Sequence, residues 1–246
     1  MSLHRHPSGD DAQTSEDTAR DPIAGDAAVF SNRHAAGERL AAALMQYRGE
    51  DTLILGIPRG GVEVAAAVAL HLGAELDVVI ARKIGVPDVP ELAMGAVTAA
   101  GGQYIEQETV AGRGVTEQQL AAAIARESEE ARARDVRFRG GRAHPRIAHR
   151  TVIIVDVGLA TGATVRATLH AIRAQGPARL VAAVPMGPRE VHDMLRGDAD
   201  DVVCLYVQEP FEAVGLAYDD FRQVTDETVE RILREFQAGH WQTGGV

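Results

Sequence analysis

The sequence predicts an α/β domain of the doubly wound type, in which helices cover both faces of a mostly parallel sheet. Short apolar runs alternate along the chain with segments whose apolar residues have helical spacing. The runs are apolar at nearly every position, as is typical of parallel strands that are buried on both faces. A chain of 246 residues, 46% of them hydrophobic, is long enough to bury such a sheet.

The composition excludes several kinds of site and partner. The net charge of -10 argues against nucleic acid as a partner, because nucleic-acid binding normally needs a basic face. Cys204 is the only cysteine, which excludes intrachain disulfides and cysteine-based zinc sites. No apolar run approaches the roughly 20 residues that span a bilayer, and the N-terminus lacks the apolar stretch of a secretory signal. We therefore expect a cytoplasmic protein without membrane partners.

The chain begins with a tail and a helix. Residues 1–28 are polar and lack periodicity, which predicts a disordered tail. The stretch SNRHAAGERLAAALMQY has helical spacing, with Ser31 or Asn32 as the predicted N-cap.

A strand, a helix and a second strand follow. DTLILGI predicts a strand that ends at a proline and two glycines, VEVAAAVALHLG a helix that closes at Gly73, and LDVVIAR the next strand. Together they predict a βαβ unit with a parallel pair of strands.

The middle of the chain carries weaker signals. Residues 84–112 mix glycine and proline with two short apolar runs, LAMGAVT and QYIE, and we predict a mobile loop followed by short strands. The long stretch TEQQLAAAIARESEEARARDVRFR predicts a helix that opens with a capping box of Thr116 and Gln119. Its many charges predict a solvated face.

The second half of the chain continues the alternation. TVIIVDVGLATGATVRATLHAI predicts a strand, a loop and a helix, and ARLVAAVPMG and DVVCLYV predict strands on either side of the helix PREVHDMLRG. An aromatic segment, EPFEAVGLAYDDFRQ, leads into the closing helix TDETVERILREF with Thr225 as N-cap. Residues 241–246 are predicted to be a short tail.

The loop of residues 160–164 has the chemistry of a phosphate-binding site. Small residues let consecutive backbone N–H groups converge where the helix begins, and Thr161 and Thr164 add hydroxyl donors. The glycine spacings of Walker and dinucleotide-binding loops are both absent. The alternative is a glycine-containing turn in which threonine only caps the helix.

Three motifs resemble those of the type I phosphoribosyltransferases and follow one another along the chain in the order expected of that family. VIIVDVGLATGAT resembles their signature for phosphoribosyl diphosphate (PRPP), GIPRGG resembles their first pyrophosphate loop, and ARKIG resembles the strand end that precedes their mobile catalytic loop. EPFEAVGLAYDDF resembles a bacterial subfamily of undefined base specificity, so the resemblance implies a phosphoribosyltransferase domain over residues 29–240 with its type I fold.

The resemblance implies a role for each matched residue. Arg82, Lys83 and Asp156 would be catalytic, with Asp156 also binding the ribose hydroxyls and, through PRPP and water, Mg²⁺. The PRPP-binding set would consist of Arg59, Gly60, Asp156, Ala160, Thr161, Gly162, Ala163 and Thr164. Mg²⁺ is the implied cofactor and PRPP the co-substrate. Lys83, the only lysine of the chain, and the arginines would face the pyrophosphate.

The same resemblance implies a lid, a hood and a dimer. Residues 84–112 would be the mobile catalytic loop that excludes water. A small C-terminal hood over residues 208–224 would hold a planar base against Phe211, Tyr218 and Phe221, which could instead be core residues. A homodimer is expected from the family.

Two positions depart from the family pattern. Val157 stands where the family carries a second acidic residue, which would weaken PRPP binding, and we predict that Val157→Asp strengthens it. Ala160 replaces the Asp that serves 6-oxopurine enzymes as a proton acceptor, so hypoxanthine or guanine is not the favoured acceptor. The leading hypothesis is a phosphoribosyltransferase of nucleotide salvage acting on a nucleobase-like acceptor. The alternatives are a regulatory PRPP sensor and a PRPP-binding domain with weakened catalysis.

Overall fold

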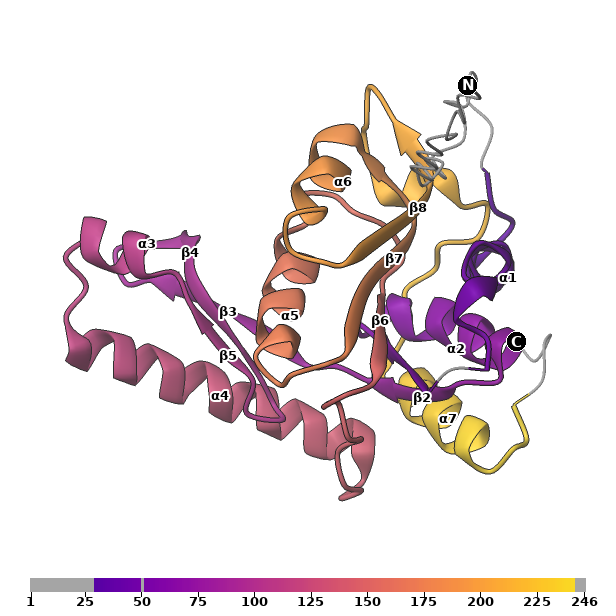
Figure 1. The fold of residues 1–246 in the computed structure, drawn as a ribbon, viewed down its shortest axis with the longest axis horizontal. Helices are drawn as coiled ribbons and strands as arrows, with labels where there is room; N and C mark the ends of the chain where they lie inside the picture. The colour runs from indigo at the N-terminus through magenta and orange to yellow at the C-terminus, as the bar shows by residue number, and fades with distance from the viewer. Residues whose placement is uncertain (1–28, 50, 242–246) are drawn as a thin grey trace, which may run out of the picture.

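The computed structural model describes residues 29–49 and 51–241 (Figure 1). The predicted tails, residues 1–28 and 241–246, lie outside these ranges except for Trp241. The body of the molecule is a five-stranded sheet in the order β2-β1-β6-β7-β8. All neighbouring pairs in it are parallel. Its strands are β1 (Thr52–Gly56), β2 (Glu75–Val78), β6 (Thr151–Val155), β7 (Arg179–Pro188) and β8 (Asp201–Gln208).

Helices cover both faces of this sheet, which confirms the doubly wound α/β fold. The helices α1 (Arg33–Ala43), α2 (Gly60–Leu72) and α7 (Asp226–Gln237) share one apolar core with one face, and α5 (Ala163–Arg173) and α6 (Arg189–Leu195) share another core with the opposite face. The N-caps Asn32 and Thr225 and the closing Gly73 are confirmed. A short 3-10 turn, Met45–Tyr47, joins α1 to β1.

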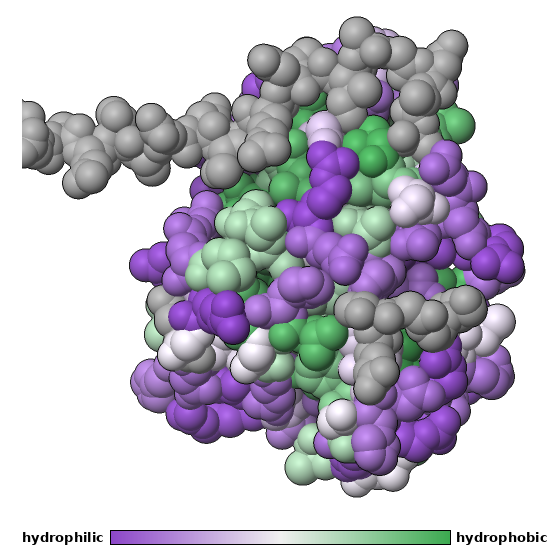
Figure 2. All heavy atoms as spheres, turned by 90° about the vertical axis from the view of Figure 1, so that its right-hand side faces the viewer, coloured by the Kyte–Doolittle hydropathy of each residue, from purple (hydrophilic) through white to green (hydrophobic). Residues whose placement is uncertain are grey.

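The surface over α1, α2 and α7 is mostly hydrophilic, with apolar side chains showing between the polar ones (Figure 2). Within the described ranges, no helix is both long enough and apolar enough to cross a membrane. The longest helix, α4 (Glu117–Arg139), has 23 residues and is rich in charged side chains.

An antiparallel arm, residues 81–139, projects from the body (Figure 1). Its three-stranded sheet has the order β3-β4-β5, and the helix α4 lies along it. The arm consists of β3 (Ala81–Val86), β4 (Val89–Thr98), β5 (Gln103–Ile105), α3 (Gln107–Gly112) and α4. Strands at the two predicted apolar runs and the capping box of Thr116 with Gln119 are confirmed.

Two predictions about this region were wrong in their local structure. The strand predicted at LDVVIAR is two strands in different sheets, because β2 ends at Val78 and the chain leaves the parallel sheet before β3 begins. The loop predicted ahead of the two short strands is itself mostly strand, because Ile84 and Met94 pack with Ala123 of α4 in a core of their own, and Gln107–Gly112 form the helix α3. The mobility of this segment stays a prediction.

The predicted hood is held by a segment from the other end of the chain. Residues 208–224 contain the 3-10 turn Val214–Ala217, and Tyr218 bridges to Phe30. Backbone hydrogen bonds join Phe30 to Ala217 and Asp219, and the rings of Phe30 and Tyr218 pack together. The hood is therefore fixed to the sequence just before α1.

Candidate functional site

The loop between β6 and α5 lies at the carboxyl end of the parallel sheet. Strand β6 is buried at every position, and the loop enters α5 through Gly162, whose φ is 69°. A Cβ at position 162 would lie 2.3 Å from Cγ1 of Val191 in α6. Glycine is therefore required by both the left-handed backbone and the close approach of α6.

The loop encloses a small cavity of about 150 Å³. The predicted phosphate-binding residues, Ala160 to Thr164, line it together with Asp156 and with Val214 of the hood. The structure thus brings together the residues that were predicted to hold the phosphate and the ribose. Their binding roles stay predictions.

Asp156 is partly buried at the end of β6. Its Oδ1 accepts a hydrogen bond from the backbone N–H of Val157 at 2.7 Å. Burial raises the pKa of the Asp156 carboxyl to about 7, and the Val157 N–H opposes this to a smaller extent. A Cβ at Gly61 would lie 3.1 Å from the same Oδ1, so the first turn of α2 runs directly beside this carboxyl group.

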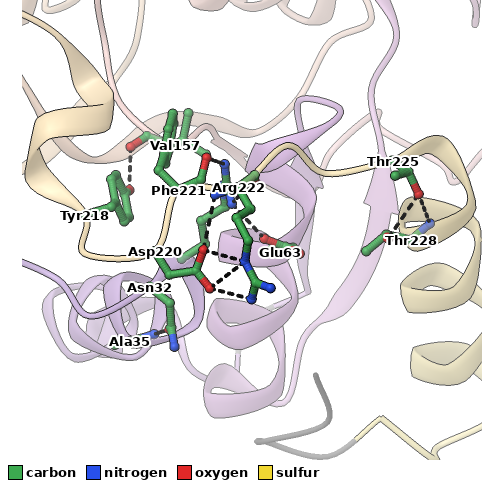
Figure 3. A network of polar contacts seen from close by, with 11 residues as sticks. Asn32, Ala35, Glu63, Val157, Tyr218, Asp220, Phe221, Arg222, Thr225 and Thr228 are labelled. Atoms are coloured by element: carbon green, nitrogen blue, oxygen red, sulfur yellow. Dashed lines mark hydrogen bonds and ion pairs between the residues drawn. The ribbon is translucent and has the colours of Figure 1, made fainter.

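Val157 does not face the cavity that Asp156 lines. Its side chain packs with the apolar core next to α2. A Cβ added at Gly60 would lie 2.8 Å from Cγ1 of Val157 and 3.0 Å from Nε of Arg33, so these two side chains lie close together. Its carbonyl oxygen accepts the Tyr218 hydroxyl at 2.6 Å (Figure 3). This orientation argues against the predicted gain in PRPP affinity for Val157→Asp, which a binding measurement tests.

Arg59 lies at the start of α2 but points away from the other predicted anion-binding residues. Its Nη1 is 3.6 Å from Oδ1 of Asp226, the first residue of α7. Arg59 lines neither the loop cavity nor the larger cleft described next. The predicted contact of Arg59 with pyrophosphate is therefore not supported by this arrangement, whereas Gly60 keeps its backbone beside the loop.

A larger cleft of about 640 Å³ lies between the body and the arm. Arg82 and Lys83 line it from β3, and Thr164 lines it from α5. Thr164 also lines the loop cavity, so the two cavities are adjacent at this residue. The predicted Arg–Lys pair thus faces the site, although from an antiparallel strand of the arm and not from the end of a parallel strand.

Arg82 is paired with an acidic residue that the sequence interpretation placed on a solvated face. Arg82 Nε and Nη2 both lie close to Oε2 of Glu127, at 3.0 and 2.9 Å. Glu127 is only 8% exposed and also pairs with Arg126. Arg126 and Arg134 line the cleft from α4 as well.

A repeat along α4 could have revealed this buried face. Ala123, Glu127, Ala131 and Asp135 recur every four residues, and all four are buried. The two alanines mark a face that packs closely, and the two acidic residues on the same face then need cationic partners. The prediction of a solvated helix was therefore right for the opposite face only.

The hood aromatics occupy three different environments. Tyr218 is 5% exposed, donates to Val157, and has the rings of Phe30 and Phe221 beside it. Its predicted role as a stacking surface does not fit this burial. Phe221 is 36% exposed, with the Arg33 guanidinium 4.2 Å from its ring centroid, and Phe211 is partly buried.

Among the described residues, no three His, Cys, Asp or Glu side chains lie close enough together to hold a metal ion by themselves. Asp156 offers one partly buried carboxylate beside the phosphate loop. One carboxylate of this kind fits Mg²⁺ that arrives with a phosphorylated ligand and keeps most of its waters, because Mg²⁺ is usually held that way.

Comparison with known proteins agrees with the geometry. The family model described as "Phosphoribosyl transferase domain" matches residues 28–220. A crystal structure of TT1426 from Thermus thermophilus is 42% identical with a TM-score of 0.77, covering 84% of this chain and 98% of that one.

Two curated relatives from Mycobacterium tuberculosis carry the name "Putative phosphoribosyl transferase", MT0597 in strain CDC 1551 / Oshkosh and Rv0571c in strain ATCC 25618 / H37Rv. Each is 39% identical over 218 residues, which is 89% of this chain. The chain spans about half the length of these relatives, 49%. From the family match and these relatives, the chain belongs to the phosphoribosyl transferase family.

Proposed function

We propose that the protein transfers the 5-phosphoribosyl group of PRPP to a nucleobase-like acceptor and releases pyrophosphate. The observation that carries this proposal is that two adjacent cavities share Thr164 in their linings. One is a phosphate-sized loop cavity with a carboxyl group, and the other is a cleft with arginine and lysine side chains. A phosphosugar with a pyrophosphate group has the charges that these two cavities complement.

In this proposal the loop residues orient the sugar. Backbone N–H groups near Gly162 and the hydroxyls of Thr161 and Thr164 bind the 5-phosphate at the start of α5. Asp156 accepts hydrogen bonds from the ribose hydroxyls, and in its ionised form both carboxylate oxygens act only as acceptors. Fixing both ends of the sugar holds its C1 atom for attack.

The departing pyrophosphate belongs to the cleft under the arm. The bond from C1 to the pyrophosphate oxygen breaks as a base nitrogen bonds to C1, and Arg82 and Lys83 stabilise the negative charge that accumulates on the leaving group. Mg²⁺, when bound with PRPP near Asp156, would neutralise part of that charge. The arm would also exclude water and so limit hydrolysis of PRPP.

Calorimetric titration of PRPP with Mg²⁺, followed by a pyrophosphate-release assay over a panel of bases, tests the proposal. We expect saturable PRPP binding and release with at least one base, other than hypoxanthine or guanine because of Ala160. Absence of PRPP binding would refute the proposal. Binding without release for any base would instead support a PRPP sensor or a catalytically weakened domain. The homodimer, the cytoplasmic location and a role in nucleotide salvage remain predictions.

A further inference from the structure

Glu127 of α4 is a buried carboxylate in the wall of the cleft, and its side chain is 10% exposed. Each of its two oxygens is taken by one guanidinium. Arg82 donates Nε–H to Oε2 at 3.0 Å with Nη2 at 2.9 Å, and Arg126 places Nε and Nη2 both 3.1 Å from Oε1. A buried carboxylate is tolerated when cationic side chains pair with it and donate hydrogen bonds to it.

This arrangement leaves donors for a ligand. A guanidinium has five N–H groups, and the contacts with Glu127 engage only the Nε and Nη2 edge of Arg82 and of Arg126. Both arginines line the cleft, with side chains 41% and 66% exposed. Two guanidinium charges and one carboxylate leave a net positive charge, to which Lys83 adds another cation of the cleft lining.

Packing fixes the position of Glu127. It lies between Ala123 and Ala131, one turn away on either side, and both alanines are buried. Arg134 follows Glu127 by seven residues, which places it on the same helical face, and it also lines the cleft. The cationic wall is thus built from α4 as well as from β3.

From these contacts we propose that Glu127 is a positioning residue that holds Arg82 and Arg126 as a pair for the pyrophosphate group, with α4 supplying part of that site. Two planar guanidinium groups at a fixed spacing suit two linked phosphate groups. The inference rests on the proposed function, since it names residues of the same site.

The alternative is that Glu127 only sequesters Arg82, and it predicts a change in pyrophosphate affinity of the opposite sign. A carboxylate beside an anion site repels the anion, so a Glu127 that only sequestered Arg82 would weaken pyrophosphate binding. Removing its charge would then increase the affinity. A positioning residue predicts a decrease despite the gain in net positive charge.

Isothermal titration of inorganic pyrophosphate into the full chain separates these outcomes. We expect Glu127→Gln to weaken pyrophosphate binding roughly tenfold, as for a lost charge-assisted contact. Glu129→Gln, which removes the same charge from an exposed position on the same helix, should leave the affinity unchanged. Ribose 5-phosphate should bind all three proteins alike, because it needs the Asp156–Thr164 loop and not the arm.

A double-mutant cycle distinguishes positioning from a general effect on the arm. On an Arg82→Ala background, Glu127→Gln should weaken pyrophosphate binding by no more than about threefold, because the two residues act together. Arg126→Ala, at a side chain that is 66% exposed, should weaken it about fivefold by removing one guanidinium.

Unchanged or tighter binding by Glu127→Gln, or a full tenfold effect on the Arg82→Ala background, would overturn the inference alone. No pyrophosphate binding by the wild-type chain would overturn the pyrophosphate half of the proposed function as well. A shared loss of ribose 5-phosphate and pyrophosphate binding in Glu127→Gln would also contradict the inference, because it would show a general disturbance.

Discussion

The phosphate loop and the cleft under the arm are adjacent at Thr164, yet they are built in different ways. Apart from Val214, the loop cavity is lined by one short segment of the chain, Asp156 and residues 158–165, which joins a buried strand to a helix. The cleft instead joins β3 to α4, with Arg82 and Glu127 45 positions apart in the sequence.

This difference has a physical consequence for each half of the site. In the loop, the backbone conformation itself creates the binding groups, so a single glycine is decisive. In the cleft, side chains from separate elements must be held at fixed distances, so buried ion pairs and the attachment of the arm become decisive. The predictions that follow test this distinction, from the largest expected effect to the smallest.

The attachment of the arm should depend strongly on Arg139. Its side chain is 4% exposed and pairs with Asp77 and Asp135, and it also donates to the carbonyl of Val78. Arg139→Ala should lower the free energy of unfolding by about 3–5 kcal/mol, because two carboxylates would lose their partner in the interior. Denaturant unfolding measures this, with exposed Arg132→Ala as the control. A loss below about 1 kcal/mol would show that the arm is attached by other contacts.

The Asp156 carboxyl should make stability depend on pH. Below pH 3.8 the group is protonated in both states, whereas between that value and about 7 only the unfolded chain ionises, so the folded state loses stability as the pH rises. The loss should be on the order of 4 kcal/mol, complete above pH 7 and absent from Asp156→Asn. Urea unfolding at a series of pH values measures it. A wild-type profile that parallels the Asn variant would contradict the raised pKa.

The phosphate loop should depend on Gly162. Gly162→Ala should cost about 2–3 kcal/mol of stability, because a left-handed alanine is strained and its Cβ would meet Val191. Gly176→Ala is the matched control, since Gly176 has a φ of 70° with open space around its Cβ position, and it should cost only about 1 kcal/mol. Ribose 5-phosphate should lose affinity for the first variant alone. Equal costs for both would argue against close packing of α6 on the loop.

Val157→Asp should have the smallest effect of these changes, and PRPP affinity should hardly respond to it. The structure revises the expectation from sequence, because the side chain faces Gly60 and Arg33, whose Nε is buried without a hydrogen-bond partner among the described residues. PRPP affinity in calorimetry should stay within about threefold, while Val157→Asp should be about 1 kcal/mol more stable than Val157→Asn through an ion pair with Arg33. A tenfold gain in the PRPP affinity of Val157→Asp would instead show that position 157 faces the ribose.

Residue periodicity predicted the parallel body well, because the strands and helices of the body are signalled by neighbouring residues in the sequence. β6 and α2 follow from runs of apolar residues, and Asn32 and Thr225 follow from capping chemistry. The arm was harder, since glycine or proline interrupts the apolar runs of β3 and β4, and these strands gain their stability from pairing with each other and packing on α4.

The sequence by itself determined the doubly wound sheet, the phosphate loop and the family, because each depends on consecutive residues whose backbone geometry is set by their neighbours. Only the tertiary structure decided which side chains face the site. Arg59 turns to Asp226, Val157 turns to Arg33, and Glu127 enters the cleft with Arg82. A side chain's partner is set by what lies across the space from it, and residues distant in the sequence supply that surface.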